Sequence, residues 1–318
     1  MYLKSNDLEK RYSIFPISHP DLWKMYKDDV DQLWVAEEVN FEKDDFDRLR
    51  PEEKLYLKNI IAFFAISDGL VIDNLATNFL NEVDILEAQY YYGNQALIEQ
   101  IHAEVYSLII ETYIKDNIEK IELFNSMETN PAVKAKAKWA ENWIAHPSFA
   151  HRLIAFACVE GIAFSSVFAG VFWFRSRNLM PGLGDANELI IRDEGSHYDF
   201  AVSLYNNYIK DEYRLHQEEI REIILSCYEV EKIFVENSMP DGLNGLTKQE
   251  MIQYVQFVTD IVLNGFGCNS EFNASNPFGF MKRIGITQKN NFFERRIGQY
   301  TRVDIPTDNE NIFNDTDF

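Results

Sequence analysis

Cysteine is scarce in this chain, and its scarcity excludes two common ways of stabilising a small fold. The 318 residues contain three cysteines, Cys158, Cys227 and Cys268, which lie far apart in the sequence. An odd number of cysteines without a C-x-x-C pair predicts neither a disulfide framework nor a thiolate zinc site. The pattern is typical of a protein in a reducing compartment, so we expect a cytoplasmic location.

Basic residues are also few. The chain has 30 lysines and arginines against 51 aspartates and glutamates, which gives a formal net charge of -21 at pH 7. Nucleic-acid binding needs a basic surface because the phosphates repel an acidic one. The composition therefore excludes nucleic acid as a partner and favours a protein partner with a basic surface.

An apolar signal sequence is missing at the N-terminus, where "MYLKSNDLEKRYSIFP" mixes charged and apolar residues. One internal stretch, residues 153–174, is long and apolar enough to cross a bilayer. Glu160 would then lie in hydrocarbon, which is costly. We therefore interpret the stretch as a helix buried on all sides in a large helical domain, with a membrane span as the alternative.

Strand-like alternation is rare, and long helical patterns dominate the chain. Pro51, followed by two acids, predicts the start of one helix. Further helices are expected over about 87–115 and 148–175. Asp185 and Glu188, after the break "MPGLGD", predict a capping box for a fourth helix. These patterns indicate an all-α fold.

The end of the chain has a different composition. Residues 301–318 are acidic and poor in apolar side chains, which predicts a disordered tail after a helical domain over 1–300. Phe313 and Phe318 are unexpected in a tail that only solvates the protein. They indicate a peptide that docks on another protein, with an inert tail as the alternative.

Two of the six histidines stand three residues after a glutamate. Glu99 precedes His102 and Glu194 precedes His197, so each pair shares one face of a helix. One long helix earlier, an acid interrupts an apolar run before each pair; these two acids are Asp68 and Glu160. Both halves of the chain thus repeat the same order, a carboxylate helix followed by a Glu-x-x-His helix.

Buried carboxylates are costly unless another charge compensates them. Four acids and two imidazoles that face inward from four helices can be compensated by two divalent cations. Oxygen and imidazole ligands suit iron or manganese and are too rich in oxygen for a structural zinc site. The arrangement is similar to that of ferritin-like carboxylate bundles, so we predict a ferritin-like helical bundle with a dinuclear metal site in its core. The alternative is a set of buried polar residues that satisfy one another.

Tyr106 follows His102 by one helical turn, about 5–6 Å along the same face, and lies within reach of an oxidant at the metals. Apolar residues on the neighbouring ligand helices predict a collar that keeps water from this phenol. They are Phe164, Phe168 and Ile190. The alternative is that all four residues serve only core packing.

At these residues the chain resembles a known family, the small, radical-generating subunit of class I ribonucleotide reductase, and above all its eukaryotic and viral branch. The resemblance covers nearly the whole chain and is carried by six segments. They are LWVAEEV (33–39), FFAISDG (63–69), EQIHAEVYSLIIETYI (99–114), FACVEGIAF (156–164), LMPGLGDANELIIRDEGSHYDFA (179–201) and NFFERRIGQY (291–300). One departure is "GLVIDN", in which Ile72 and Asp73 stand where relatives tend to have Asn and Glu.

The resemblance implies a role for each candidate residue. One metal ion would be held by Asp68, Glu99 and His102, and the other by Glu160, Glu194 and His197. Tyr106 would carry the radical inside a pocket of Phe164, Phe168 and Ile190. A long-range path for electrons and protons would run through His102, Asp193 and Trp34, with Arg192 alongside, to Tyr300.

The resemblance also implies the cofactor, the partners and the reaction. The cofactor would be two oxo-bridged iron ions, with two manganese ions or a Mn/Fe pair as alternatives. The chain would form a homodimer and dock through its tail on the large catalytic subunit, which reduces ribonucleoside diphosphates to deoxyribonucleotides. Two other hypotheses are a dimetal oxidase or monooxygenase and a non-catalytic scaffold subunit.

Overall fold

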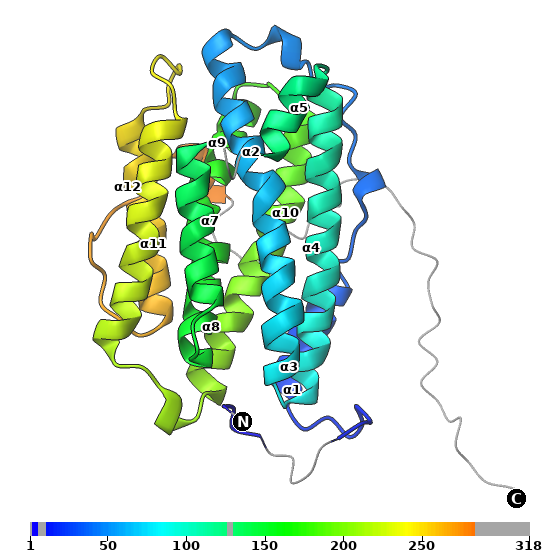
Figure 1. Ribbon diagram of the computed structural model, residues 1–318, viewed down its shortest axis with the longest axis vertical. Helices are drawn as coiled ribbons and strands as arrows, with labels where there is room; N and C mark the ends of the chain where they lie inside the picture. Colours follow the sequence, from blue (N-terminus) through cyan, green and yellow to red (C-terminus); the bar gives the residue numbers. More distant parts are fainter. Residues whose placement is uncertain (1, 6–10, 126–129, 284–318) are drawn as a thin grey trace, which may run out of the picture.

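Long helices run side by side through most of the molecule (Figure 1). The computed structural model describes residues 2–5, 11–125 and 130–283, apart from the side chains of Ala65, Ile66, Asp68 and Leu70. Within these ranges the only pairing of extended backbone is an isolated bridge between Leu3 and Ile209. The predicted all-α helical bundle is therefore confirmed.

Most of the helices follow one another through short connections, apart from residues 31–50 between α1 and α2. Those that build the bundle are α1 (Pro20–Val30), α2 (Pro51–Asn74), α4 (Leu86–Tyr113), α7 (Pro131–Ile144), α8 (Phe149–Cys158), α9 (Ser165–Ser176), α10 (Pro181–Ser203), α11 (Gln217–Ser238) and α12 (Lys248–Gly265). Shorter helices are α3 (Leu80–Glu82) and α5 (Asn117–Phe124). Wide π-helical turns extend three of the helices, as η3 (Leu75–Phe79), η4 (Val159–Ala163) and η5 (Leu204–Tyr208). Single 3-10 turns are η1 (Ala36–Glu38), η2 (Phe46–Arg48), η6 (Asp211–Tyr213) and η7 (Gly279–Arg283).

Local sequence explains several helix starts. Pro51 occupies the first turn of α2, and Glu53 accepts a hydrogen bond from the backbone N–H of Arg50 at 3.0 Å. At α12, Thr247 and Glu250 form a capping box. These side chains satisfy the N–H groups that a helix leaves without an internal partner.

The capping box predicted at Asp185 and Glu188 is wrong, because α10 begins earlier, at Pro181. Both residues lie inside the helix and pair with Arg175. The first N–H groups of α10 instead donate to Asp44, from Gly182 at 2.7 Å and from Leu183 at 2.8 Å. A loop far away in the sequence thus caps this helix, and no local motif could reveal it.

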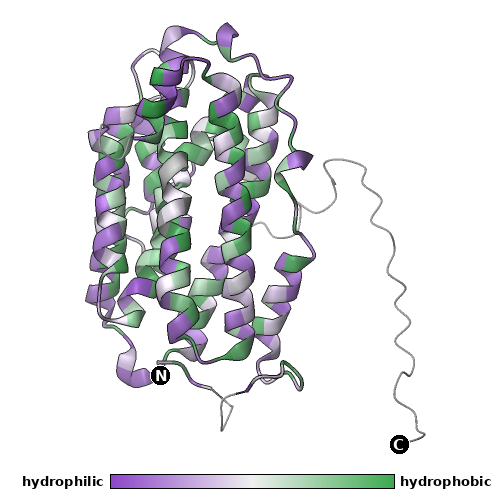
Figure 2. Ribbon diagram, turned by 45° about the vertical axis from the view of Figure 1, so that its right-hand side comes forward, coloured by the Kyte–Doolittle hydropathy of each residue, from purple (hydrophilic) through white to green (hydrophobic). Residues whose placement is uncertain are grey.

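The apolar stretch that could be mistaken for a membrane span lies at the centre of the bundle. Helix α8, turn η4 and helix α9 form one continuous span over Phe149–Ser176. In this span, 94% of an apolar segment of 18 residues is buried. Helices α7, α10, α11 and α12 pack around this span. The interpretation as a buried core helix is confirmed. In Figure 2, hydrophobic and hydrophilic residues alternate along the outer helices of the bundle.

Candidate metal centre

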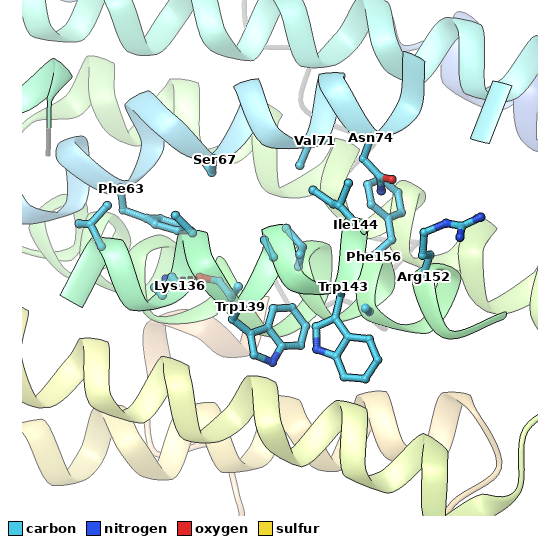
Figure 3. A pocket seen from close by; sticks show the side chains of 16 residues that line it. Phe63, Ser67, Val71, Asn74, Lys136, Trp139, Trp143, Ile144, Arg152 and Phe156 are labelled. Atoms are coloured by element: carbon cyan, nitrogen blue, oxygen red, sulfur yellow. Dashed lines mark hydrogen bonds between the residues drawn. The ribbon is translucent and has the colours of Figure 1, made fainter. Parts of the chain in front are cut away.

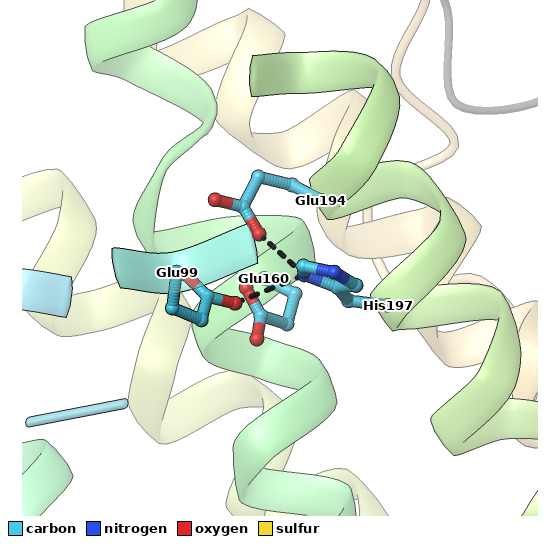
Figure 4. A group of neighbouring side chains, drawn as sticks. All are labelled: Glu99, Glu160, Glu194 and His197. Atoms are coloured by element: carbon cyan, nitrogen blue, oxygen red, sulfur yellow. Dashed lines mark hydrogen bonds and ion pairs between the residues drawn. The ribbon is translucent and has the colours of Figure 1, made fainter. Parts of the chain in front are cut away.

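Four of the predicted ligands meet in the core of the bundle (Figure 4). Glu99 comes from α4, Glu160 from η4, and Glu194 and His197 from α10. Each offers one ligand atom, and these atoms lie within 4.8 Å of one another. All four side chains are buried, so their charges are removed from water.

His102 on α4 is the fifth predicted ligand, and it faces the same carboxylates. Its Nδ1 lies 3.5 Å from Glu99 Oε2 and 3.2 Å from Glu194 Oε1. On the other side, His197 Nδ1 lies 3.0 Å from an oxygen of Glu99 and 3.0 Å from an oxygen of Glu194. Glu99 and Glu194 therefore stand between the two imidazoles and can each contact two ions.

The sixth predicted ligand, Asp68, falls on α2, which packs against α4. Its side chain lies outside the described part of the chain.

The side chains of the cluster fit a pair of divalent cations. Both carboxylate oxygens of Glu99, Oε1 of Glu194 and Nδ1 of His102 are buried, and none makes a hydrogen bond of good geometry within the described residues. Buried polar atoms without hydrogen bonds are costly, and metal ions would remove that cost. Carboxylate oxygens with imidazole nitrogens are ligands typical of iron and manganese.

Without metal, protons on the imidazoles compensate the carboxylates. Burial disfavours a charged His197, but Glu99 and Glu194 outweigh it and raise its pKa to about 10. Burial likewise opposes the charge on His102, whose pKa is nevertheless raised well above its usual range by the nearby carboxylates of Asp193, Glu194 and Glu99. Metal ions would have to displace these protons, since only a neutral imidazole is a ligand.

Glu160 is carried by a π-helical turn, a feature that is frequent at functional sites. Its Oε1 accepts a hydrogen bond from Gln95 at 3.2 Å. Gln95 lies four residues before Glu99 on the same face of α4, and the sequence analysis missed it. The spacing is a signal that could have identified it.

A hydrogen-bonded chain leads from His102 toward the N-terminal segment. Asp193 Oδ2 lies 3.2 Å from His102 Nε2 and accepts a hydrogen bond from Trp34 Nε1 at 2.7 Å. Arg192 donates two hydrogen bonds to the other oxygen of Asp193, at 3.0 and 2.8 Å. The structure thus brings together the four predicted path residues that it describes, while Tyr300 lies outside the described residues.

Tyr106 is buried one turn after His102, and its ring stacks on Phe64 with 4.3 Å between ring centroids. Phe64 in turn contacts Phe164 and Phe168, at centroid distances of 6.2 and 5.8 Å. Two of the predicted collar residues, Phe164 and Phe168, thus join Tyr106 in one aromatic cluster through Phe64, which the sequence analysis missed. Phe64 precedes Asp68 by one turn of α2. Ile190, the third predicted collar residue, is buried on α10.

An apolar pocket borders the turns that carry the candidate ligands (Figure 3). Helices α2, α7 and α8 line it, together with Val159 and Ala163, the first and last residues of η4. The five candidate ligands whose side chains are described do not line the pocket. Lys136 reaches from α7 to donate a hydrogen bond to the carbonyl oxygen of Ala163 at 2.5 Å.

Comparison with known proteins gives one consistent family. The family model "Ribonucleotide reductase, small chain" matches residues 11–277. A ribonucleoside-diphosphate reductase small chain of Vaccinia virus (strain Copenhagen) is 46% identical over 313 residues, covering 97% of each chain. The small chain of Nicotiana tabacum is 45% identical over 298 residues, covering 93% of this chain and 90% of its own.

Solved structures agree with the sequence relatives. The structure titled as the ribonucleotide reductase Rnr4 homodimer from Saccharomyces cerevisiae superimposes with a TM-score of 0.79 at 36% identity, covering 87% of this chain and 88% of its own. The dimanganese(II)-NrdF of Streptococcus sanguinis has the same fold, with a TM-score of 0.75 at 20% identity and a coverage of 86% and 98%. On the strength of the buried carboxylate and histidine cluster and of these relatives, the chain belongs to the small-chain family of ribonucleotide reductase.

Proposed function

We propose that this chain is the radical-generating small subunit of a ribonucleoside-diphosphate reductase. The observation that carries the proposal is the meeting of Glu99, Glu160, Glu194 and His197 in the buried core, with His102 facing the same carboxylates. One metal ion is assigned to Asp68, Glu99 and His102, and the other to Glu160, Glu194 and His197.

We assign iron as the metal. The ligand set also suits two manganese ions or a mixed pair, because ligand type alone rarely separates neighbouring first-row metals. When bound, the pair supplies the redox chemistry that activates O2 and oxidises Tyr106. The protein contributes the ligand geometry and a dry interior.

Tyr106 is the residue proposed to store the oxidising equivalent. Its burial, with Phe64 stacked on its ring and Phe164 and Phe168 packed behind Phe64, keeps water and small reductants away from the ring. As the phenol loses an electron it also loses its hydroxyl proton. We assign the carboxylates of the metal centre as the acceptor of that proton.

Transfer of the radical is proposed to follow the chain from His102 through Asp193 to Trp34. Arg192 keeps Asp193 ionised and fixes its position, because a guanidinium beside a buried carboxylate favours the charged form. The pKa of Asp193 is accordingly lowered, although burial opposes this. Tyr300 would continue the path toward the large subunit.

The partners follow from the relatives and from composition. A tail over 301–318 would dock on the large catalytic subunit, while residues 1–300 form the helical domain that houses the metals. The homodimer of the yeast relative, at 36% identity, supports a homodimer here. The net charge of -21 argues against nucleic acid, and we place the protein in the cytoplasm.

The two competing functions are each opposed by an observation. An oxidase or monooxygenase needs neither a buried phenol beside its metals nor a hydrogen-bonded chain through Trp34. A non-catalytic scaffold needs none of the ligands, and five of them meet here.

The test is reconstitution of the apoprotein with Fe(II) and O2, followed by electron paramagnetic resonance. Wild type should give a tyrosyl radical signal, and Tyr106→Phe should bind iron but give none. Tyr92→Phe is the matched control, because Tyr92 is another buried phenol on α4. A tyrosyl signal that persists unchanged in Tyr106→Phe would remove this residue from its assigned role.

A further inference from the structure

His197 turns one ring nitrogen toward the carboxylates and the other away from them. Its Nδ1 contacts Glu99 and Glu194, whereas its Nε2 is buried and makes no hydrogen bond to the described residues. An imidazole that binds a metal through one nitrogen almost always donates its other N–H to a carboxylate, a carbonyl or a water. His102 obeys this rule through Asp193, at 3.2 Å from its Nε2. His197 needs an acceptor of its own.

A buried carboxylate on α1 contacts the residue that precedes this histidine. Ser196, the residue before His197 on α10, donates a hydrogen bond from its hydroxyl to Asp29 Oδ1 at 2.5 Å. Asp29 is only 7% exposed, and its Oδ2 is buried without a hydrogen bond to the described residues. A buried donor, Nε2–H of His197, and a buried acceptor, Oδ2 of Asp29, thus lie on adjacent helices, and neither has a hydrogen-bond partner among the described residues.

A third polar side chain belongs to this group. The hydroxyl of Tyr91 on α4 lies 3.1 Å from the Ser196 hydroxyl. Two helices, α4 and α10, thus place hydroxyl groups near one buried carboxylate on α1, and a buried carboxylate is costly unless polar partners surround it.

We infer that Asp29 is a positioning residue for the second metal ion, because its carboxylate accepts the Nε2–H of His197 through one bridging water. This hydrogen bond fixes the tautomer in which Nδ1 is free to bind the metal and holds the ring toward Glu99 and Glu194. The inference rests on the proposed metal centre. It gives each metal-binding histidine a carboxylate partner, Asp193 for His102 and Asp29 for His197.

The test is Mn(II) binding to the full-length apoprotein without O2. The electron paramagnetic resonance signal of free Mn(II) reports how much of the metal stays unbound. Wild type should bind two ions per chain. In Asp29→Ala we expect one ion to bind about 10–100-fold more weakly and the other to keep its affinity. Asp29→Asn retains an acceptor oxygen and should lie nearer to wild type. Asp28→Asn is the matched control, since Asp28 is the neighbouring acid, is 52% exposed and pairs with Lys24.

The thermal midpoint of each apoprotein separates positioning from a purely structural role. If Asp29 had only a structural role, Asp29→Ala would lower the thermal midpoint and would weaken the binding of both ions or of neither. This result would overturn the inference. Two ions bound with wild-type affinity by Asp29→Ala would also overturn it, while the proposed metal centre would stand. A wild-type chain that binds no Mn(II) would overturn the metal centre and the inference with it.

Discussion

A buried ion pair supports the turn that carries Glu160, and removing half of it should be strongly destabilising. Lys136 is 4% exposed and lies 2.7 Å from Glu231, which is fully buried. The ammonium group also lies 3.4 Å from the ring centroid of Phe63 and 4.0 Å from that of Phe234. Burial lowers the pKa of Lys136, and the carboxylate of Glu231 counters this effect.

The magnitude follows from what each substitution leaves behind. Lys136→Met keeps the length of the side chain but leaves Glu231 with a hydrogen bond from the N–H of Ser166 at 3.3 Å and no cation at its other oxygen. An uncompensated buried charge of this kind costs about 3–5 kcal/mol of unfolding free energy. The double variant Lys136→Met/Glu231→Leu removes both charges and should recover most of that loss.

The assay is urea unfolding of the apoproteins at pH 7 and fixed protein concentration, followed by circular dichroism. Wild type, the two single variants and the double variant form a double-mutant cycle. Lys138→Met, on the exposed side of α7, is the control and should change stability by less than about 0.5 kcal/mol. A loss below about 1 kcal/mol in Lys136→Met, or a double variant as unstable as the two losses added together, would refute the reasoning.

Two further predictions concern the N-terminal segment and the tail. Burial alone would raise the pKa of Glu87, but hydrogen bonds from Arg11, Ser18 and His19 lower it from 4.5 to about 2. The contribution of Glu87 to the free energy of unfolding, about 3 kcal/mol, is therefore complete above pH 4.5 and is lost as the pH falls toward 2. Glu87→Gln should make the free energy of unfolding, measured with urea, depend less on pH in this range. Parallel pH profiles for the variant and wild type would contradict the prediction. Deletion of residues 312–318 should leave the radical signal intact and abolish ribonucleotide reduction after the large subunit is added; full activity would mean that the tail does not dock.

Much of the fold could be predicted from local patterns. Apolar periodicity and Pro51 placed the long helices because these signals act within a few turns of the chain. The start of α10 was misplaced because its cap, Asp44, comes from a loop that meets the helix only after folding. The π-helical turns have no local signature of this kind and were also missed.

The candidate site was predicted to a similar extent. Glu99, His102, Glu194 and His197 could be identified because a spacing of three residues fixes a shared helical face. Asp29 and Ser196 could not be paired in advance, since they are 167 residues apart in the sequence and their contact depends on tertiary packing.

The π-helical turn η4 also sets a limit on how the chain can change length. It holds one more residue per turn than an α-helix, so α8 and α9 are out of phase with each other across it. Losing one residue within 159–163 would rotate everything beyond it by about 100° relative to α8. Phe164 and Phe168 would then swing away from Phe64. The length of this turn is therefore constrained by the contacts of Phe164 and Phe168 with Phe64, in addition to the constraint that Glu160 places on its sequence.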